Sequence, residues 1–106
     1  MTEAKLIVLY PPPADTDEFD KAYAEEHLSL MRQSMTGMRV AVTKIAGALG
    51  GESPHYLRAE IFAPSIEAIQ AFLATPDGRA IGANAAKIST GGRPTVLFST
   101  EDVHQL

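Results

Sequence analysis

The sequence contains neither cysteine nor tryptophan among its 106 residues. Without cysteine it can form no disulfide, thiolate nucleophile or cysteine-ligated zinc site. Basic residues are also few, with 9 Lys and Arg against 13 Asp and Glu and a formal net charge of −4. Since no run of basic residues offers a broad positive surface to a phosphate backbone, we expect no nucleic acid partner.

Long apolar runs are missing too. Only about five apolar residues separate Lys5 from the proline triplet Pro11–Pro13, too few for a signal-peptide core or a membrane span. We therefore expect a cytoplasmic protein that does not use the membrane as a partner. The length is close to the commonest domain size and 45% of the residues are hydrophobic, which predicts a single domain over residues 1–106.

The common cofactor and metal motifs are absent. His27, His55 and His104 show no HxH or HExxH spacing, so we predict no metal site. The glycines form neither a phosphate loop nor a dinucleotide fingerprint, and no serine lies in a GxSxG elbow. We accordingly predict no cofactor.

In the first half of the chain, the pattern predicts a strand followed by a long helix. The β-branched and aromatic run Leu6–Tyr10 is typical of a strand, and the prolines after it end the strand. An N-cap and an acidic first turn then predict a helix from about Thr16 to about Ser34. Its apolar stripe is predicted at spacings of about four, four and three residues, through Phe19, Tyr23, His27 and Leu30.

The second half predicts a hairpin, a broken helix and a closing strand. Residues 38–46 and 55–62 alternate with a period of two and flank a glycine-rich loop. Ser65 is a plausible N-cap, and Thr75 with Pro76 predicts that the helix breaks and restarts through about Lys87. Residues 95–99 form the last predicted strand.

The predicted fold class is α+β, in the ferredoxin-like β-α-β-β-α-β order with a four-stranded antiparallel sheet and its helices on one face. The first strand is apolar on both sides, yet the two helical regions can cover only one face of the sheet. We therefore expect the second face to bury against an identical subunit, which gives a homodimer and a dimeric α+β barrel. Arg58 and Glu60 are predicted to share one strand face with Tyr56 and Phe62. There they either pair across the dimer contact or face a wet cavity.

The chain resembles the EthD family of small dimeric α+β-barrel proteins over nearly its whole length. The residues that carry the resemblance are Leu9-Tyr10-Pro11, Asp17, Phe19, Tyr23, Glu26-His27-Leu28, Met38-Arg39, Tyr56-Leu57, Ala59-Glu60-Ile61-Phe62, Ser65, Ala68 and Pro76-Asp77-Gly78. The resemblance implies a cavity between sheet and helices. The family takes its name from an ether-degradation gene cluster beside a monooxygenase system, and some relatives act on cyclic or aromatic compounds without a metal.

His27 is the first candidate catalytic residue, because its imidazole can take or give a proton near neutral pH and the resemblance places a histidine here. The alternative is a histidine that only completes a helix face. Tyr23, one turn earlier, could orient His27 or bind a ligand oxygen, although a packing role is equally open to it. Glu26 points about 100° away from His27 on a helix, so we expect it to be solvated or to cap.

Four further residues are candidates for substrate binding, namely Tyr10, Phe19, Tyr56 and Arg58. Packing is the alternative role for the aromatic residues, and a structural ion pair with Glu60 is the alternative for Arg58.

Two functions follow as hypotheses. The first is an EthD-like protein that binds a small, mostly apolar cyclic or aromatic compound, with metal-free acid/base chemistry at His27 or an oxidoreductase-associated role in degradation of the compound. The second is a non-catalytic accessory module of a monooxygenase system, which would have an oxygenase as its partner.

Overall fold

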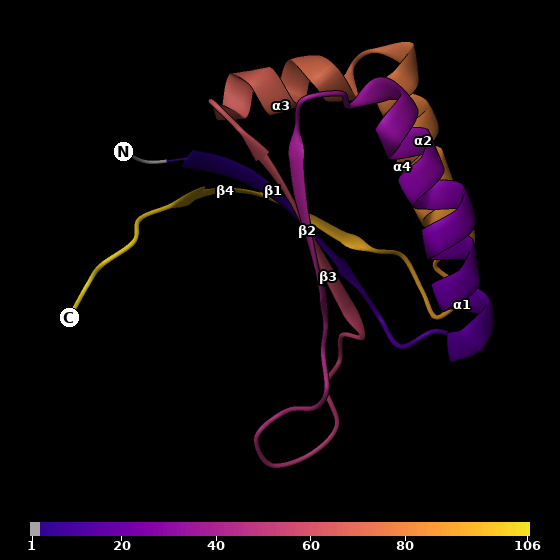
Figure 1. Cartoon of the computed structure of the whole chain (residues 1–106). Helices are drawn as coiled ribbons and strands as arrows, with labels where there is room; N and C mark the ends of the chain where they lie inside the picture. The colour runs from indigo at the N-terminus through magenta and orange to yellow at the C-terminus, as the bar shows by residue number, and fades with distance from the viewer. Residues whose placement is uncertain (1–2) are drawn as a thin grey trace.

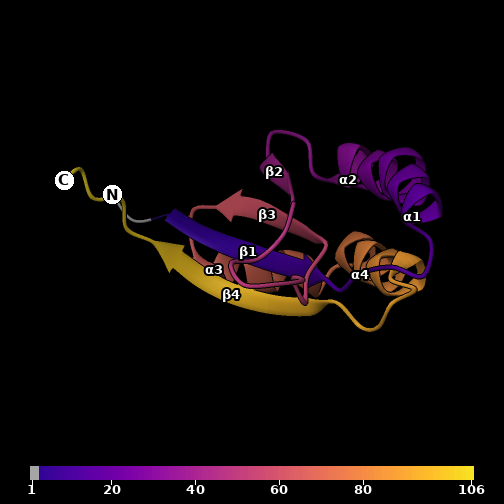
Figure 2. The same ribbon diagram turned by 90° about the horizontal axis from the view of Figure 1, so that it is seen from below.

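Four strands form one antiparallel sheet in the computed structural model, which describes residues 3–106. They are β1 (Glu3–Tyr10), β2 (Arg39–Lys44), β3 (Leu57–Ala63) and β4 (Thr95–Glu101). Their order across the sheet is β2-β3-β1-β4, as Figure 2 shows, and each neighbouring pair is antiparallel. Helices follow β1 and β3, which completes the predicted β-α-β-β-α-β order of the ferredoxin-like fold.

All the helices lie on one face of this sheet (Figure 1). They are α1 (Thr16–Ala22), the π-helical segment η1 (Tyr23–His27), α2 (Leu28–Ser34), α3 (Ile66–Leu73) and α4 (Pro76–Ile88). The caps of α1, α3 and α4 are Asp15, Ser65 and Thr75, and each side chain accepts a hydrogen bond from the backbone N–H three residues later. The predicted break before Pro76 is confirmed, as is the long first helix from Thr16 to Ser34. None of the helices in the described range is long and apolar enough to cross a membrane.

The π-helical segment η1 keeps an unusual ladder of side chains on one face. Buried residues recur at every fourth position, at Phe19, Tyr23, His27, Met31 and Met35. In a regular α-helix such a ladder would drift by about 160° from its first to its last member. The π turn, in which the Leu28 N–H reaches the Tyr23 carbonyl, has roughly 80° per residue and so removes roughly 90° of that drift. Leu30, predicted to continue the stripe, is partly buried and packs against the core, while its neighbour Met31 is the fully buried residue of this turn.

The helix-facing side of the sheet carries the core. In β1 the buried residues Leu6, Val8 and Tyr10 alternate with residues of the opposite face. The helices do not cover the edge strand β4. Its residues Val96 and Phe98 pair with the buried Val8 and Leu6 of β1. They nevertheless remain 47% and 46% exposed. The helix layer thus covers β1 and β3 and leaves the β4 edge open.

The opposite face of the sheet has no covering layer in the described chain (Figure 1). Its apolar centre consists of Ile7 and Leu9 in β1 and Leu97 in β4, where Leu97 lies directly opposite Ile7 and is 44% exposed. We call this surface the open face. It matches the predicted apolar second side of the first strand.

The charges of the open face are paired within one chain. Glu60 accepts from both Lys5 and Arg58, with an Arg58 Nη2 to Glu60 Oε2 distance of 3.2 Å. Lys5 also reaches Glu101 at 2.7 Å and is only 6% exposed. The hydrogen bonds with Glu101 and Glu60 raise the pKa of Lys5, and the hydrogen bond with Lys5 lowers the pKa of Glu60. Arg58 and Glu60 therefore pair with each other within one chain, while the buried Nε of Arg58 has no hydrogen-bond partner among the described residues.

Candidate functional site

A cavity of about 80 Å³ lies between the sheet and the helix layer. Side chains from all the helical regions except α1 and from strands β1, β3 and β4 surround it. Its lining residues are Leu6, Val8, Tyr10, Tyr23, His27, Met31, Met35, Met38, Ala59, Ile61, Ile69, Phe72, Leu73, Ile81, Gly82 and Val96. The wall is apolar apart from a histidine and two tyrosines, so the cavity suits a compact and mostly apolar ligand.

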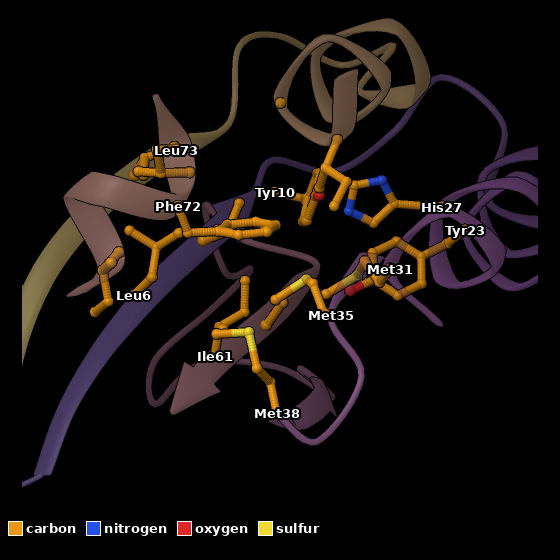
Figure 3. A pocket seen from close by; sticks show the side chains of 16 residues that line it. Leu6, Tyr10, Tyr23, His27, Met31, Met35, Met38, Ile61, Phe72 and Leu73 are labelled. Atoms are coloured by element: carbon orange, nitrogen blue, oxygen red, sulfur yellow. The ribbon is translucent and has the colours of Figure 1, made fainter. Parts of the chain in front are cut away.

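Tyr23 and His27 lie side by side on the wall of this cavity, as Figure 3 shows, with ring centroids 5.1 Å apart. Both are about 4% exposed. The Tyr23 hydroxyl is buried and has no hydrogen-bond partner among the described residues. A buried hydroxyl without a partner costs free energy, so an unpaired one at a cavity marks a place where a ligand oxygen would be stabilised.

Burial keeps both tyrosines of the cavity in their neutral form. It raises the pKa of the Tyr23 phenol to about 12. It also raises the pKa of the Tyr10 phenol, and the neighbouring Tyr23, with its ring 5.8 Å away, adds to that shift. Near neutral pH each phenol can therefore donate a hydrogen bond but does not act as an anionic base.

His27 is held from the side of α4. Its Nδ1 lies 2.9 Å from Oδ1 of Asn84. Burial lowers the pKa of His27 below its ordinary value of 6.5, and the hydrogen bond with Asn84 offsets part of that effect. The imidazole is consequently neutral at neutral pH, and its second ring nitrogen is turned toward the cavity (Figure 3).

The lowered pKa of His27 predicts a loss of stability in acid. The unfolded chain binds a proton at His27 as the pH falls through about 6.5, whereas the folded chain does so only at lower pH. The free energy of unfolding should therefore fall below pH 6.5, with a slope of at most about 1.4 kcal/mol per pH unit from this residue, and level off below the folded pKa. Urea denaturation of the native chain and of His27→Gln between pH 5 and 8 measures this as a difference curve.

The titratable and charged groups near His27 are the other groups that could contribute to the difference between the two stability curves. They are Tyr23 on η1 and, through Asn84, the carboxylate of Glu26 and the ammonium of Lys87. Tyr10 on β1 lines the same cavity and packs against Tyr23. Carboxylates elsewhere titrate in both proteins and cancel. His104→Gln, in the exposed tail, is the matched control. A difference curve that is flat for His27→Gln would contradict the prediction.

Phe19 and Tyr56 lie behind the cavity wall and do not line it. The Phe19 ring packs against Tyr10, Tyr23 and Tyr56, with centroids 5.3 to 6.0 Å away. The Tyr56 hydroxyl donates to Asp20 of α1 at 3.0 Å. Tyr56 therefore points to the helix side, and β3 begins only at Leu57, so the expectation that Tyr56 shares a strand face with Arg58 was wrong.

Arg58 lies on the other side of the sheet. It is paired with Leu9 in the register of β1 and β3 and contributes to the open face. Of the six predicted site residues, His27, Tyr23 and Tyr10 meet at one cavity, while Phe19, Tyr56 and Arg58 do not line it. Within residues 3–106 no three His, Asp or Glu side chains come close enough to hold a metal ion.

Sequence reasoning missed Asn84 and the methionines of the cavity. Met31, Met35 and Met38 line the cavity and also a wider groove of about 410 Å³ between α2 and β2. They form the partition between these two spaces. Methionine is flexible and adapts to irregular shapes, so this wall can yield to a ligand larger than the cavity itself.

The EthD domain pattern matches residues 11–91. The chain belongs to the EthD family. An 11.0 kDa protein of the thcB-thcC intergenic region of Rhodococcus erythropolis is 33% identical over 99 residues, which cover 92% of this chain and 94% of the relative. The crystal structure of an ethyl tert-butyl ether D (EthD) family protein from Bacillus halodurans is 35% identical, with a TM-score of 0.83 over 95% of this chain and 99% of that one.

The fold is shared by solved structures of much lower sequence identity. A dimeric ferredoxin-like protein from Jannaschia sp. superimposes with a TM-score of 0.62 over 97% of this chain and 100% of its own, at 14% identity. At that identity the likeness concerns the fold alone. The predicted family and the predicted ferredoxin-like fold class are thus both confirmed.

Proposed function

We propose that this EthD chain binds a compact, mostly apolar cyclic or aromatic compound that carries an oxygen, and that His27 moves a proton on it. The observation that carries the proposal is the unpartnered Tyr23 hydroxyl beside His27 in an otherwise apolar cavity. An apolar ring would occupy the wall of aliphatic and methionine side chains. The ligand oxygen would take the hydrogen bond that Tyr23 lacks.

The chemistry that fits these two groups is proton transfer next to a carbonyl or phenol. The neutral imidazole of His27 takes a proton from the ligand and becomes imidazolium, while the electron pair moves onto the ligand oxygen. The Tyr23 hydroxyl donates to that oxygen and stabilises its developing charge. Return of the proton to a different ligand atom completes an isomerisation, so this step needs no oxidant. A place in the degradation of the compound beside an oxidoreductase is part of the same proposal.

The proposed assembly is a homodimer joined through the open face. The apolar side chains Ile7, Leu9 and Leu97 lie together there, and burying them against a second copy is favourable. The Jannaschia relative of this fold is described as dimeric. Burial of this surface would leave the cavity on the opposite side of the sheet intact.

Three methionine methyl groups in the cavity wall provide the test. Phenol and cyclohexanone should shift the NMR signals of Met31, Met35 and Met38, and benzene should do so as an apolar control. Tyr23→Phe is expected to weaken phenol and cyclohexanone binding about five- to tenfold, the value of one hydrogen bond, and to leave benzene binding unchanged. Equal affinities of both proteins for all three probes, or no shift in any methyl signal, would refute the proposed site.

A turnover assay distinguishes an enzyme from the alternative, a non-catalytic accessory module of a monooxygenase system. His27→Gln should still bind the probes but lose any conversion of enolisable ketones and lactones, followed by chromatography. If the native chain binds but converts none of them and co-purifies with an oxygenase, the accessory role in a monooxygenase system is favoured.

A further inference from the structure

The orientation of the His27 imidazole is set by side chains that do not touch the cavity. Asn84 of α4 contacts His27 on one side and Glu26 of η1 on the other. Neither Asn84 nor Glu26 lines the cavity. They therefore act on the site only through His27.

In the hydrogen-bonded series His27–Asn84–Glu26, the carboxylate of Glu26 decides which group donates at each contact. Glu26 can only accept, so it takes the amide N–H of Asn84, at an Nδ2 to Oε1 distance of 3.5 Å. That fixes the amide so that Asn84 Oδ1 faces His27 Nδ1 at 2.9 Å. An amide oxygen can only accept, so the proton of the neutral imidazole must be on Nδ1. The ammonium of Lys87 lies 3.6 Å from the same Glu26 oxygen.

We propose that Glu26 and Asn84 are positioning residues that hold His27 in the Nδ1–H tautomer, with the lone pair of Nε2 directed into the cavity. This inference rests on the proposed function for its purpose, because only this tautomer offers a base to a ligand there. Its geometry does not depend on any ligand. The π turn assists, since η1 contains both Glu26 and His27 and brings them to face the same residue of α4.

The nitrogen chemical shifts of His27 report the tautomer directly and need no ligand. In the native chain, long-range proton–nitrogen NMR at pH 8 should show a protonated Nδ1 and an unprotonated Nε2, assigned by loss of the signals in His27→Gln. Asn84→Leu should abolish this preference, because Nδ1 loses its acceptor. Asn84→Asp should restore it, because a carboxylate also accepts from Nδ1.

Glu26 is the exposed member of this hydrogen-bonded series, so its substitution should not disturb folding. Glu26→Gln should mix the two tautomers, because glutamine can also donate and no longer fixes the amide. Glu25→Gln, at an exposed neighbouring position, is the matched control and should keep the native pattern. An Nε2–H tautomer in the native chain, or an unchanged pattern in both Asn84→Leu and Glu26→Gln, would overturn the proposal. Failure of phenol and cyclohexanone to bind would refute the proposed function and leave this result intact.

Discussion

Leu97→Asp is expected to convert the proposed homodimer into monomers. Leu97 lies at the apolar centre of the open face, directly opposite Ile7. In a two-fold symmetric contact the substitution enters twice, and each buried unpaired carboxylate costs about 2 kcal/mol or more. The dissociation constant should therefore rise about a thousandfold. Lys5 gives no relief, because Glu60 and Glu101 already occupy its ammonium group.

Sedimentation equilibrium at micromolar concentration measures this change. Thr100→Asp is the matched control, since it places the same charge on the same strand but on the opposite side of the sheet, at an exposed position opposite Ala4. It should leave the assembly unchanged. A native chain that sediments as an 11.3 kDa monomer would contradict the open face as an interface, as would a Leu97→Asp dimer of native affinity.

The fold was accessible from the sequence because its signals are local. Three prolines after Tyr10, the caps at Ser65 and Thr75, and the glycine-rich loop between two alternating segments each mark a boundary within a few residues. Once the order β-α-β-β-α-β is known, few sheet topologies remain. Which residues of β1 share a face of the sheet follows from alternation alone.

The cavity was only partly accessible because it is built from residues far apart in the chain. His27, Tyr23 and Tyr10 could be proposed from residue type and resemblance. Asn84 could not, because its role depends on how α4 packs against η1, which no spacing encodes. Tyr56 does not share the strand face of Arg58 because its hydroxyl donates a hydrogen bond to Asp20 of α1.

The sequence carries one further signal, in the spacing of the large side chains along the first helix. Large side chains recur at every fourth residue from Phe19 to Met35, a ladder too long for one face of a regular α-helix. Such a ladder predicts that the helix must be locally underwound, and π turns are frequent at functional sites. Here the underwound turn is Tyr23–His27, the segment that carries both proposed catalytic groups.

The largest loss of stability is expected from Phe19→Ala. Phe19 is 2% exposed, and its ring contacts Tyr10, Tyr23 and Tyr56. Removing it leaves a cavity behind the wall of the proposed site and should lower the free energy of unfolding by about 4 kcal/mol. Urea denaturation at one fixed protein concentration measures the change, because assembly adds to apparent stability. Leu49→Ala, in a fully exposed loop, should change it by less than about 0.5 kcal/mol.

Phe19→Leu distinguishes two possible roles of Phe19, namely packing against Tyr10 and Tyr23 and direct contact with the ligand. Leucine refills most of the volume, so this variant should lose only about 1.5 kcal/mol and remain folded. If Phe19 acts by holding Tyr10 and Tyr23 in place, phenol should bind this variant within about threefold of the native affinity, since Phe19 does not line the cavity. A folded Phe19→Leu chain that no longer binds phenol, but in which the methionine methyl signals still respond to benzene, would instead assign Phe19 a direct part in binding the ligand, as its sequence position first suggested.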